Sequence, residues 1–195
     1  MASTPSTMLD LGTAAPNFAL VDVRSGEIVS LSDFQEAAGL LVAFWCNHCP
    51  YVKHIEEAFV EFAAEVMERG VGVIAISSND VAAYPQDGPE AMAELAHDMG
   101  YGFPYLHDET QEVATAFQAA CTPDFFLFDE TGELYYRGQF DASRPSGSAP
   151  VDGRDLRAAV DALLIGDHSP GEQVASLGCN IKWIPGQEPA WSIRV

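Results

Sequence analysis

Hydrophobic positions near the centre of the chain change from a continuous run to a helical period. The run Leu-Leu-Val-Ala-Phe-Trp occupies residues 40–45 directly after Gly39, which predicts a buried strand. Apolar side chains then recur every three or four positions with glutamates between them, which predicts an amphipathic helix over residues 50–69. A second apolar run covers residues 71–76. The three segments therefore predict a right-handed βαβ unit with parallel strands.

Shorter segments flank this unit on both sides. Before it, two apolar stretches on either side of Gly26 predict a β-hairpin, after a mobile polar tail over residues 1–10. Turn formers over residues 79–88 predict a loop, and residues 167–195 predict an irregular tail that packs on the body through its apolar side chains. The other predicted elements are a helix from Pro89 to Gly100, a strand over 103–107, a helix with a capping box of Asp108 and Gln111, strands over 124–128 and 133–137, and a helix that Gly166 ends.

Two cysteines, Cys46 and Cys49, stand where the predicted strand becomes the predicted helix. The unpaired N–H groups and the positive dipole end of a helix stabilise a thiolate, which is the attacking species. A second sulfur less than one turn away can close a disulfide and release a bound partner. We therefore expect Cys46 to be a nucleophile at the exposed helix start and Cys49 to resolve the mixed disulfide.

Two other interpretations of this cysteine pair compete with the redox one. A tetrahedral zinc site needs four ligands, commonly from a second close pair, whereas Cys121 and Cys179 stand alone in the sequence. We therefore expect no metal. The pair could also be two inert core thiols, because free cysteine is among the most buried residue types.

Several blocks of sequence resemble a known family. Phe44-Trp45-Cys46-Asn47-His48-Cys49 resembles a thioredoxin-fold active site, and residues 121–129, 136–141 and 178–183 resemble the peroxiredoxin-like (AhpC/TSA, redoxin) branch. The resemblance spans the whole chain. It implies an α/β, thioredoxin-like fold: a central mixed β-sheet flanked by helices, with an N-terminal β-hairpin extension, a helix–strand–helix insertion and an irregular C-terminal tail.

The same resemblance sets the expected domain organisation. We expect one thioredoxin-like domain over residues 1–195, in which residues 1–36 form the N-terminal tail and hairpin. The core covers residues 37–166, with the insertion at about 79–119, and residues 167–195 form the packed tail.

Site residues beyond the two cysteines follow from the resemblance as well. It implies that Thr122-Pro123 is a cis-proline loop facing the cysteines, whose exposed backbone edge pairs with an extended substrate peptide. Cys-x-His-Cys resembles the site of strongly oxidising family members, so His48 is expected to tune the thiolate, with Trp45 as a flank of the site. Cys121 and Cys179 are candidate accessory thiols.

The function implied is thiol–disulfide exchange, and two alternatives stay open. Pro50 prefers the first helical position, which would make Cys49 the N-cap, as in a peroxiredoxin's peroxidatic Cys-Pro pair. Cys46 then occupies the place of the hydroxyl residue that a peroxidase uses, so only weak antioxidant activity is expected. The second alternative is a non-catalytic binding or redox-sensing protein with the same fold.

Composition restricts the partners. The chain has 29 acidic and 9 basic residues and a net charge of −20, which disfavours nucleic acid and anionic membranes. No basic-apolar leader and no 18-residue apolar stretch are visible, so a cytoplasmic protein with reduced cysteines is expected. Expected substrates are protein or small-molecule disulfides, or peroxide, with a thioredoxin-reductase-type or glutathione electron donor and no cofactor. The sequence carries no signal for an oligomeric state.

Overall fold

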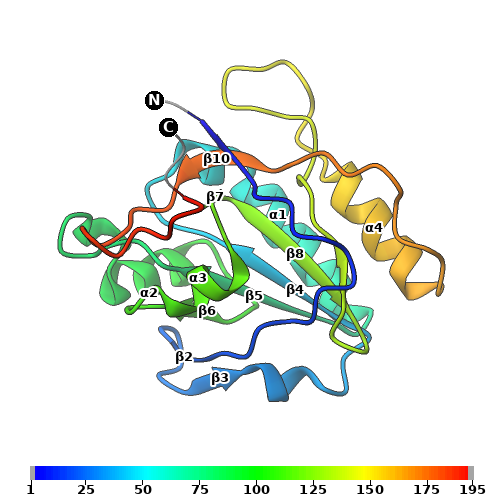
Figure 1. Cartoon of the computed structure of the whole chain (residues 1–195), viewed down its shortest axis with the longest axis horizontal. Coiled ribbons are helices and arrows are strands. Elements are labelled where there is room, and N and C mark those ends of the chain that lie inside the picture. Colours follow the sequence, from blue (N-terminus) through cyan, green and yellow to red (C-terminus); the bar gives the residue numbers. More distant parts are fainter. Residues whose placement is uncertain (1–2, 193–195) are drawn as a thin grey trace.

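A mixed seven-stranded sheet, ordered β3-β2-β6-β5-β4-β8-β9, forms the centre of the computed structural model, which describes residues 3–192 (Figure 1). Its strands are β2 (Ala19–Asp22), β3 (Ile28–Ser30), β4 (Gly39–Phe44), β5 (Val71–Ser77), β6 (Tyr105–His107), β8 (Asp124–Asp129) and β9 (Leu134–Tyr136). The helices are α1 (Pro50–Glu68), α2 (Pro89–Asp98), α3 (Glu112–Phe117) and α4 (Arg154–Leu164), with 3-10 turns η1 (Leu31–Phe34) and η2 (Pro85–Asp87).

The predicted βαβ unit is present at the middle of this sheet. β4 and β5 pair in parallel from Gly39–Val71 to Phe44–Ile76, and α1 connects them. β8 pairs antiparallel with the other side of β4, so β4 is hydrogen-bonded on both edges. All six residues of β4 are buried, as a continuous apolar run predicts.

Side chains of β4 alternate between two hydrophobic layers, as the period of a strand requires. Leu41 and Ala43 join one layer, which includes buried side chains of α1, α2 and α4. Leu40, Val42 and Phe44 join the other, which includes buried side chains of α3. The chain leaves β4 at Phe44 and enters α1 at Pro50, so the cysteine-containing turn lies at the end of an interior strand of the sheet.

The predicted hairpin and the elements of residues 79–119 are present, with one correction. β2 and β3 pair antiparallel, and Gly26 adopts a positive φ in their connection. Asp108 is not the N-cap of the helix that follows it. Gln111 is the residue before α3, and the Asp108 carboxylate instead accepts hydrogen bonds from the backbone N–H groups of Val113 and Ala114. The carboxylate thus reaches the free N–H groups of the first turn from outside the helix.

Both ends of the chain are more ordered than the sequence predicts. A second sheet, ordered β1-β10-β7, joins β1 (Thr4–Pro5), β10 (Leu177–Asn180) and β7 (Cys121–Thr122), and Figure 1 shows β10 beside the N-terminal strand. The prediction of a mobile tail over residues 1–10 is therefore wrong at β1, and the prediction of an irregular C-terminal segment is wrong at β10. Backbone pairing that joins distant segments leaves no local pattern in such short strands. Residues 1–2 and 193–195 of these predicted tails lie outside the described part.

The C-terminal segment contacts the body through apolar side chains. Ile181 is buried in the layer that contains α3, and the rings of Trp183 and Trp191 meet edge to face at 5.8 Å. Within residues 3–192, no helix combines the length and the apolar character that crossing a membrane requires.

Candidate active site

The start of α1 positions the two cysteines. Pro50 is the first helical residue and Cys49 is the N-cap, because proline has a helical φ and lacks the N–H that this position leaves unpaired. Cys46 therefore precedes the helix by several residues. Its side chain is 1% exposed and that of Cys49 is 0% exposed. The expectation of an exposed nucleophile at the helix start is wrong for this reduced structure, in which all four cysteines are free.

Thr122 contacts both sulfurs from the opposite loop. Its hydroxyl and the Cys46 sulfur are 3.3 Å apart, and its carbonyl oxygen lies 3.1 Å from the Cys49 sulfur, from which it accepts a hydrogen bond. The Thr122–Pro123 peptide bond is cis, as the family resemblance implies. The cysteine turn and the cis-proline loop thus face one another across the two sulfurs.

The proximity of the two thiols separates their pKa values. The pKa of Cys49 falls to about 5, chiefly through the neighbouring Cys46 thiol, with help from the Cys179 thiol and the Val52 N–H against the opposing effect of burial. The pKa of Cys46 rises well above its ordinary value through the neighbouring Cys49 thiol, through burial and through the charge of Asp87. The negative charge of the pair is therefore favoured on Cys49 in this arrangement.

The contacts of Thr122 favour the opposite placement of the proton. Its carbonyl oxygen accepts a hydrogen bond only from a protonated Cys49, and its hydroxyl can donate to a Cys46 thiolate. The two thiols therefore titrate as a coupled pair that shares one proton. The Thr122 carbonyl oxygen loses its donor when Cys49 is the thiolate and keeps it when Cys46 is the thiolate.

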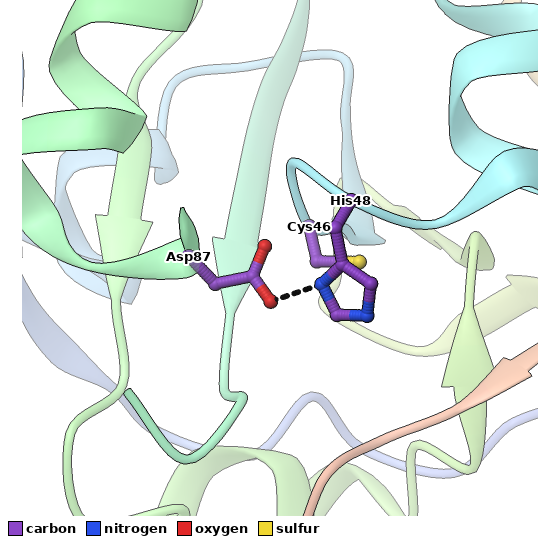
Figure 2. Close-up of side chains that lie close together, drawn as sticks. All are labelled: Cys46, His48 and Asp87. Carbon is purple, nitrogen blue, oxygen red and sulfur yellow. Dashed lines mark hydrogen bonds and ion pairs between the residues drawn. The ribbon is translucent and has the colours of Figure 1, made fainter. Parts of the chain in front are cut away.

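Asp87 is a functional residue that the sequence analysis missed. Its carboxylate is fully buried and accepts hydrogen bonds from the Asn47 backbone N–H at 2.8 Å, the Asn79 side chain at 2.8 Å and His48 Nδ1 at 2.5 Å. Figure 2 shows it facing His48 beside the Cys46 sulfur. The turn-rich loop of residues 79–88 gave no signal for this role, because only the fold brings η2 against the cysteine turn.

His48 is held in place on both sides. Nδ1 bonds to Asp87, and the ring stacks on Tyr84 with centroids 5.3 Å apart and planes 9° from parallel. A carboxylate that accepts from Nδ1–H leaves Nε2 free to exchange a proton. His48 therefore lies where the sequence predicts it, next to Cys46, and a half-buried position connects it to solvent.

Cys46, His48 and Asp87 could also supply ligands for a metal ion. One sulfur, nitrogen or oxygen atom from each lies within 4.8 Å of the others, a donor set that zinc accepts. In this structure, however, Asp87 and His48 satisfy one another, and Asp87 accepts from two further donors. The observed contacts fit a hydrogen-bonded thiol site.

Trp45 lies in the core and does not flank the thiols at the surface. Its indole is fully buried and stacks on Phe59 with ring centroids 4.9 Å apart. Nε1–H donates to the Tyr101 hydroxyl at 2.9 Å, which donates to the Glu56 carboxylate at 2.5 Å. Burial and this carboxylate raise the pKa of Tyr101. A tuning role for Trp45 stays a prediction, and the structure assigns the side chain to core packing.

The backbone edge next to the cis-proline loop is covered, contrary to expectation. β10 pairs antiparallel with β7, with Cys179 opposite Thr122, and both Thr122 and Pro123 are buried. An external peptide must therefore displace β10 to pair with this edge. The substrate-binding role of Thr122 and Pro123 stays a prediction, and the physical reason for the difference is the C-terminal strand that the sequence analysis did not detect.

The two remaining cysteines differ in their relation to this site. Cys179 pairs with Thr122 across the β7–β10 edge, and burial together with the nearby Cys49 thiol raises its pKa to about 12. Cys121 is directed to the Pro123 carbonyl oxygen at 3.5 Å, and burial raises its pKa well above the ordinary value. Of the two candidate accessory thiols, Cys179 is the one that lies opposite Thr122, the residue that contacts both site sulfurs.

Fold and site together define a thioredoxin-like protein with a dithiol between a central strand and its helix. A family model for the AhpC/TSA family matches residues 11–137, and the chain belongs to this family. The thioredoxin domain of a thiol-disulfide oxidoreductase from Bacteroides vulgatus has the same fold, with a TM-score of 0.59 and 16% identity over 78% of this chain and 99% of that one. This confirms the predicted fold class and family.

Two further proteins resemble the chain more closely in sequence. An uncharacterized conserved protein from Geobacillus kaustophilus is 50% identical, and its crystal structure has a TM-score of 0.93 over 95% of this chain and 98% of that one. The thiol-disulfide oxidoreductase ResA of Geobacillus kaustophilus (strain HTA426) is 28% identical over 131 residues, which are 67% of this chain and 70% of that protein.

Proposed function

We propose that the protein is a thiol–disulfide oxidoreductase that uses Cys46 and Cys49 as a dithiol/disulfide pair. The observation that carries this proposal is that both sulfurs contact Thr122 at the start of α1, where the Cys46 sulfur lies 3.3 Å from its hydroxyl and the Cys49 sulfur lies 3.1 Å from its carbonyl oxygen. Such a pair can lose two electrons and close a disulfide with little movement. The similarity to ResA, which is named a thiol-disulfide oxidoreductase, supports the same chemistry.

The proposed reaction begins at Cys46. Transfer of the shared proton to Cys49, whose thiol then donates to the Thr122 carbonyl oxygen, leaves a Cys46 thiolate that accepts from the Thr122 hydroxyl. The thiolate attacks one sulfur of a substrate disulfide and expels the other as a thiolate. Cys49 then loses its proton and attacks Cys46, which releases the second substrate thiolate and closes the Cys46–Cys49 disulfide. The substrate gains two electrons, and the protein loses two.

Cys46 is the preferred attacking sulfur because of its neighbours. It adjoins Asn47 and His48, which are partly exposed, whereas Cys49 is enclosed by Thr122, Cys179 and the core. His48 Nε2 can pass a proton between this side of the site and solvent, while Asp87 fixes the imidazole. Return to the dithiol needs two electrons from a donor, for which a thioredoxin-reductase-type protein or glutathione is suited, and the cytoplasm is the compartment proposed.

Turnover tests the proposal. The protein, supplied with a regenerating reductant, should reduce a protein disulfide repeatedly, whereas a non-catalytic binding protein would react once at most. Cys46→Ser should abolish exchange, and Cys49→Ser should accumulate a mixed disulfide between Cys46 and the substrate. The control is Cys121→Ser, which removes a buried thiol that is directed to the Pro123 carbonyl. Failure of the wild type to turn over, or trapping by Cys46→Ser in place of Cys49→Ser, would overturn the proposal or reverse the two roles.

A further inference from the structure

The C-terminal strand carries a third thiol into the site. Gly178 of β10 approaches β7 so closely that a Cβ atom there would lie 2.0 Å from the Thr122 carbonyl oxygen, well inside any permitted contact. Only glycine allows this approach. The next residue, Cys179, pairs with Thr122 and belongs to the same buried cluster as Cys49. The same carbonyl oxygen accepts from Cys49, so both thiols gather around one residue.

We propose that Cys179 is a third exchange thiol, which moves the disulfide from Cys46–Cys49 to Cys49–Cys179 and so ties β10 to the start of α1. The proposal rests on the proposed function, because substrate reduction supplies the first disulfide. β10 occupies the edge at the cis-proline loop from within the chain, in the position that the sequence analysis assigned to a substrate peptide. Cys179 therefore lies on the strand that covers the loop, opposite the residue whose carbonyl oxygen accepts from Cys49.

The exchange balances without an external oxidant. The Cys179 sulfur attacks the Cys49 sulfur, a new bond forms between them, and the Cys46–Cys49 bond breaks. The proton that Cys179 loses is matched by the proton that Cys46 takes up, so the protein keeps one disulfide and its oxidation state is unchanged. The product has Cys46 as a free thiol next to His48 and Asp87, while the C-terminal strand is covalently fixed over the loop.

Whether Cys49 is a thiol or part of a disulfide controls how readily the Cys179 thiol ionises. In the dithiol form, burial opposes ionisation of Cys179, and the Cys49 thiol and its charge oppose it further. Closing the Cys46–Cys49 disulfide removes the Cys49 charge, and the nearby Lys182 favours the Cys179 thiolate. The third thiol therefore becomes more reactive when the disulfide that it would attack has formed.

Peptide mapping distinguishes the two disulfides directly. Cleavage after lysine and arginine places Cys46 and Cys49 together on residues 25–53, Cys179 on residues 158–182 and Cys121 on residues 70–137. A Cys46–Cys49 disulfide is therefore an internal loop, whereas Cys49–Cys179 links two peptides. The full-length protein is equilibrated in glutathione buffers, quenched in acid, alkylated, digested and analysed by mass spectrometry.

The expected result is a loop together with a smaller amount of the 25–53/158–182 link in the wild type. The link should become the main disulfide in Cys46→Ser, disappear in Cys179→Ser and persist in the matched control Cys121→Ser. Two results would show that the third-thiol proposal is wrong while the proposed function stands. In the first, the wild type forms the loop but neither the wild type nor Cys46→Ser forms the link. In the second, Cys46→Ser carries glutathione on Cys49. If the wild type forms neither loop nor link, the proposed function itself fails.

Discussion

Neutralising Asp87 should lower the pKa of the Cys46 thiol. The Asp87 carboxylate is fully buried, and its charge is one of four causes that raise this pKa, after the neighbouring Cys49 thiol and burial and ahead of the charge of Cys49. Asp87→Asn keeps the size of the side chain and removes the charge. Cys49→Ser should be introduced first in both proteins, because it leaves Cys46 as the single titrating thiol of the pair and separates the effect of Asp87 from the shared proton.

The magnitude follows from the distance between the two groups. A carboxylate oxygen of Asp87 and the sulfur of Cys46 lie within 4.8 Å. At an effective dielectric constant of ~20, two unit charges at this separation repel by about 3 kcal/mol. Because ~1.4 kcal/mol corresponds to one pKa unit, full removal of the repulsion lowers the pKa of Cys46 by about two units. The asparagine dipole and local relaxation reduce this, so we expect a decrease of roughly one to two units.

The assay is thiolate absorbance against pH, repeated as the pH dependence of alkylation of Cys46. In Asp87→Asn the charged acceptor of His48 Nδ1–H is replaced by a neutral amide, so the same pair of titrations in a His48→Gln background separates the loss of charge from a change in the imidazole. A pKa of Cys46 that stays constant or rises when Asp87 is neutralised, in both backgrounds, would show that this carboxylate does not set the proton position.

Four further outcomes are expected. Because the pKa of Cys49 is lowered to about 5, the reduced pair should carry one negative charge at neutral pH, and its thiolate absorbance should fall only as the pH drops through about 5; a transition centred near ~8.5, the value of an ordinary cysteine, would contradict the shared-proton site. His48→Pro and His48→Gln should both raise the pKa of Cys46 and make the reduction potential more negative by tens of millivolts, or about 1–3 kcal/mol, because the thiolate that His48 stabilises exists only in the reduced form. Equilibration with glutathione measures the potential, and unchanged values in both variants would show that His48 does not influence the thiols. Peroxide should be consumed far more slowly than by a dedicated peroxiredoxin, because Cys49 is 0% exposed and Cys46 replaces the hydroxyl residue. If rapid-mixing kinetics instead show fast oxidation that is lost in Cys49→Ser but kept in Cys46→Ser, the protein is a peroxidase and Cys49 is its reactive cysteine. Arg137→Met should lower the free energy of unfolding by about 3–5 kcal/mol, since it leaves the fully buried Asp124 carboxylate without its ion-pair partner; denaturant unfolding measures the loss, and a neutral result would show that the pair is not needed for stability.

The amino-acid sequence predicts the local elements of this fold well. The apolar run before Cys46 and the helical period after Cys49 reflect burial on a strand and on one helix face, and both elements are present close to the predicted bounds. The Cys-Pro step correctly predicts that Cys49 is the N-cap, because the conformational preference of Pro50 is local.

Features that depend on distant segments could not be predicted in this way. Asp87 reaches the site only because the fold brings η2 against the cysteine turn, and Cys179 does so only because a two-residue strand, β7, pairs with β10. Neither contact has a periodicity or a motif in the sequence. The same covering strand buries Thr122 and Pro123, so a loop expected to be exposed is enclosed.

A redox titration with assignment of the cysteines tests the central claim most directly. The wild-type protein is equilibrated over a range of thiol–disulfide buffer potentials, and alkylation of each cysteine is quantified by mass spectrometry. The account predicts one two-electron transition in which Cys46 and Cys49 lose alkylation together, apart from the smaller fraction in which Cys179 replaces Cys46, while Cys121 remains alkylated throughout. Cys46 and Cys49 that stay fully alkylated under oxidising conditions, or that acquire only separate single adducts, would contradict the claim that they form an exchanging dithiol pair.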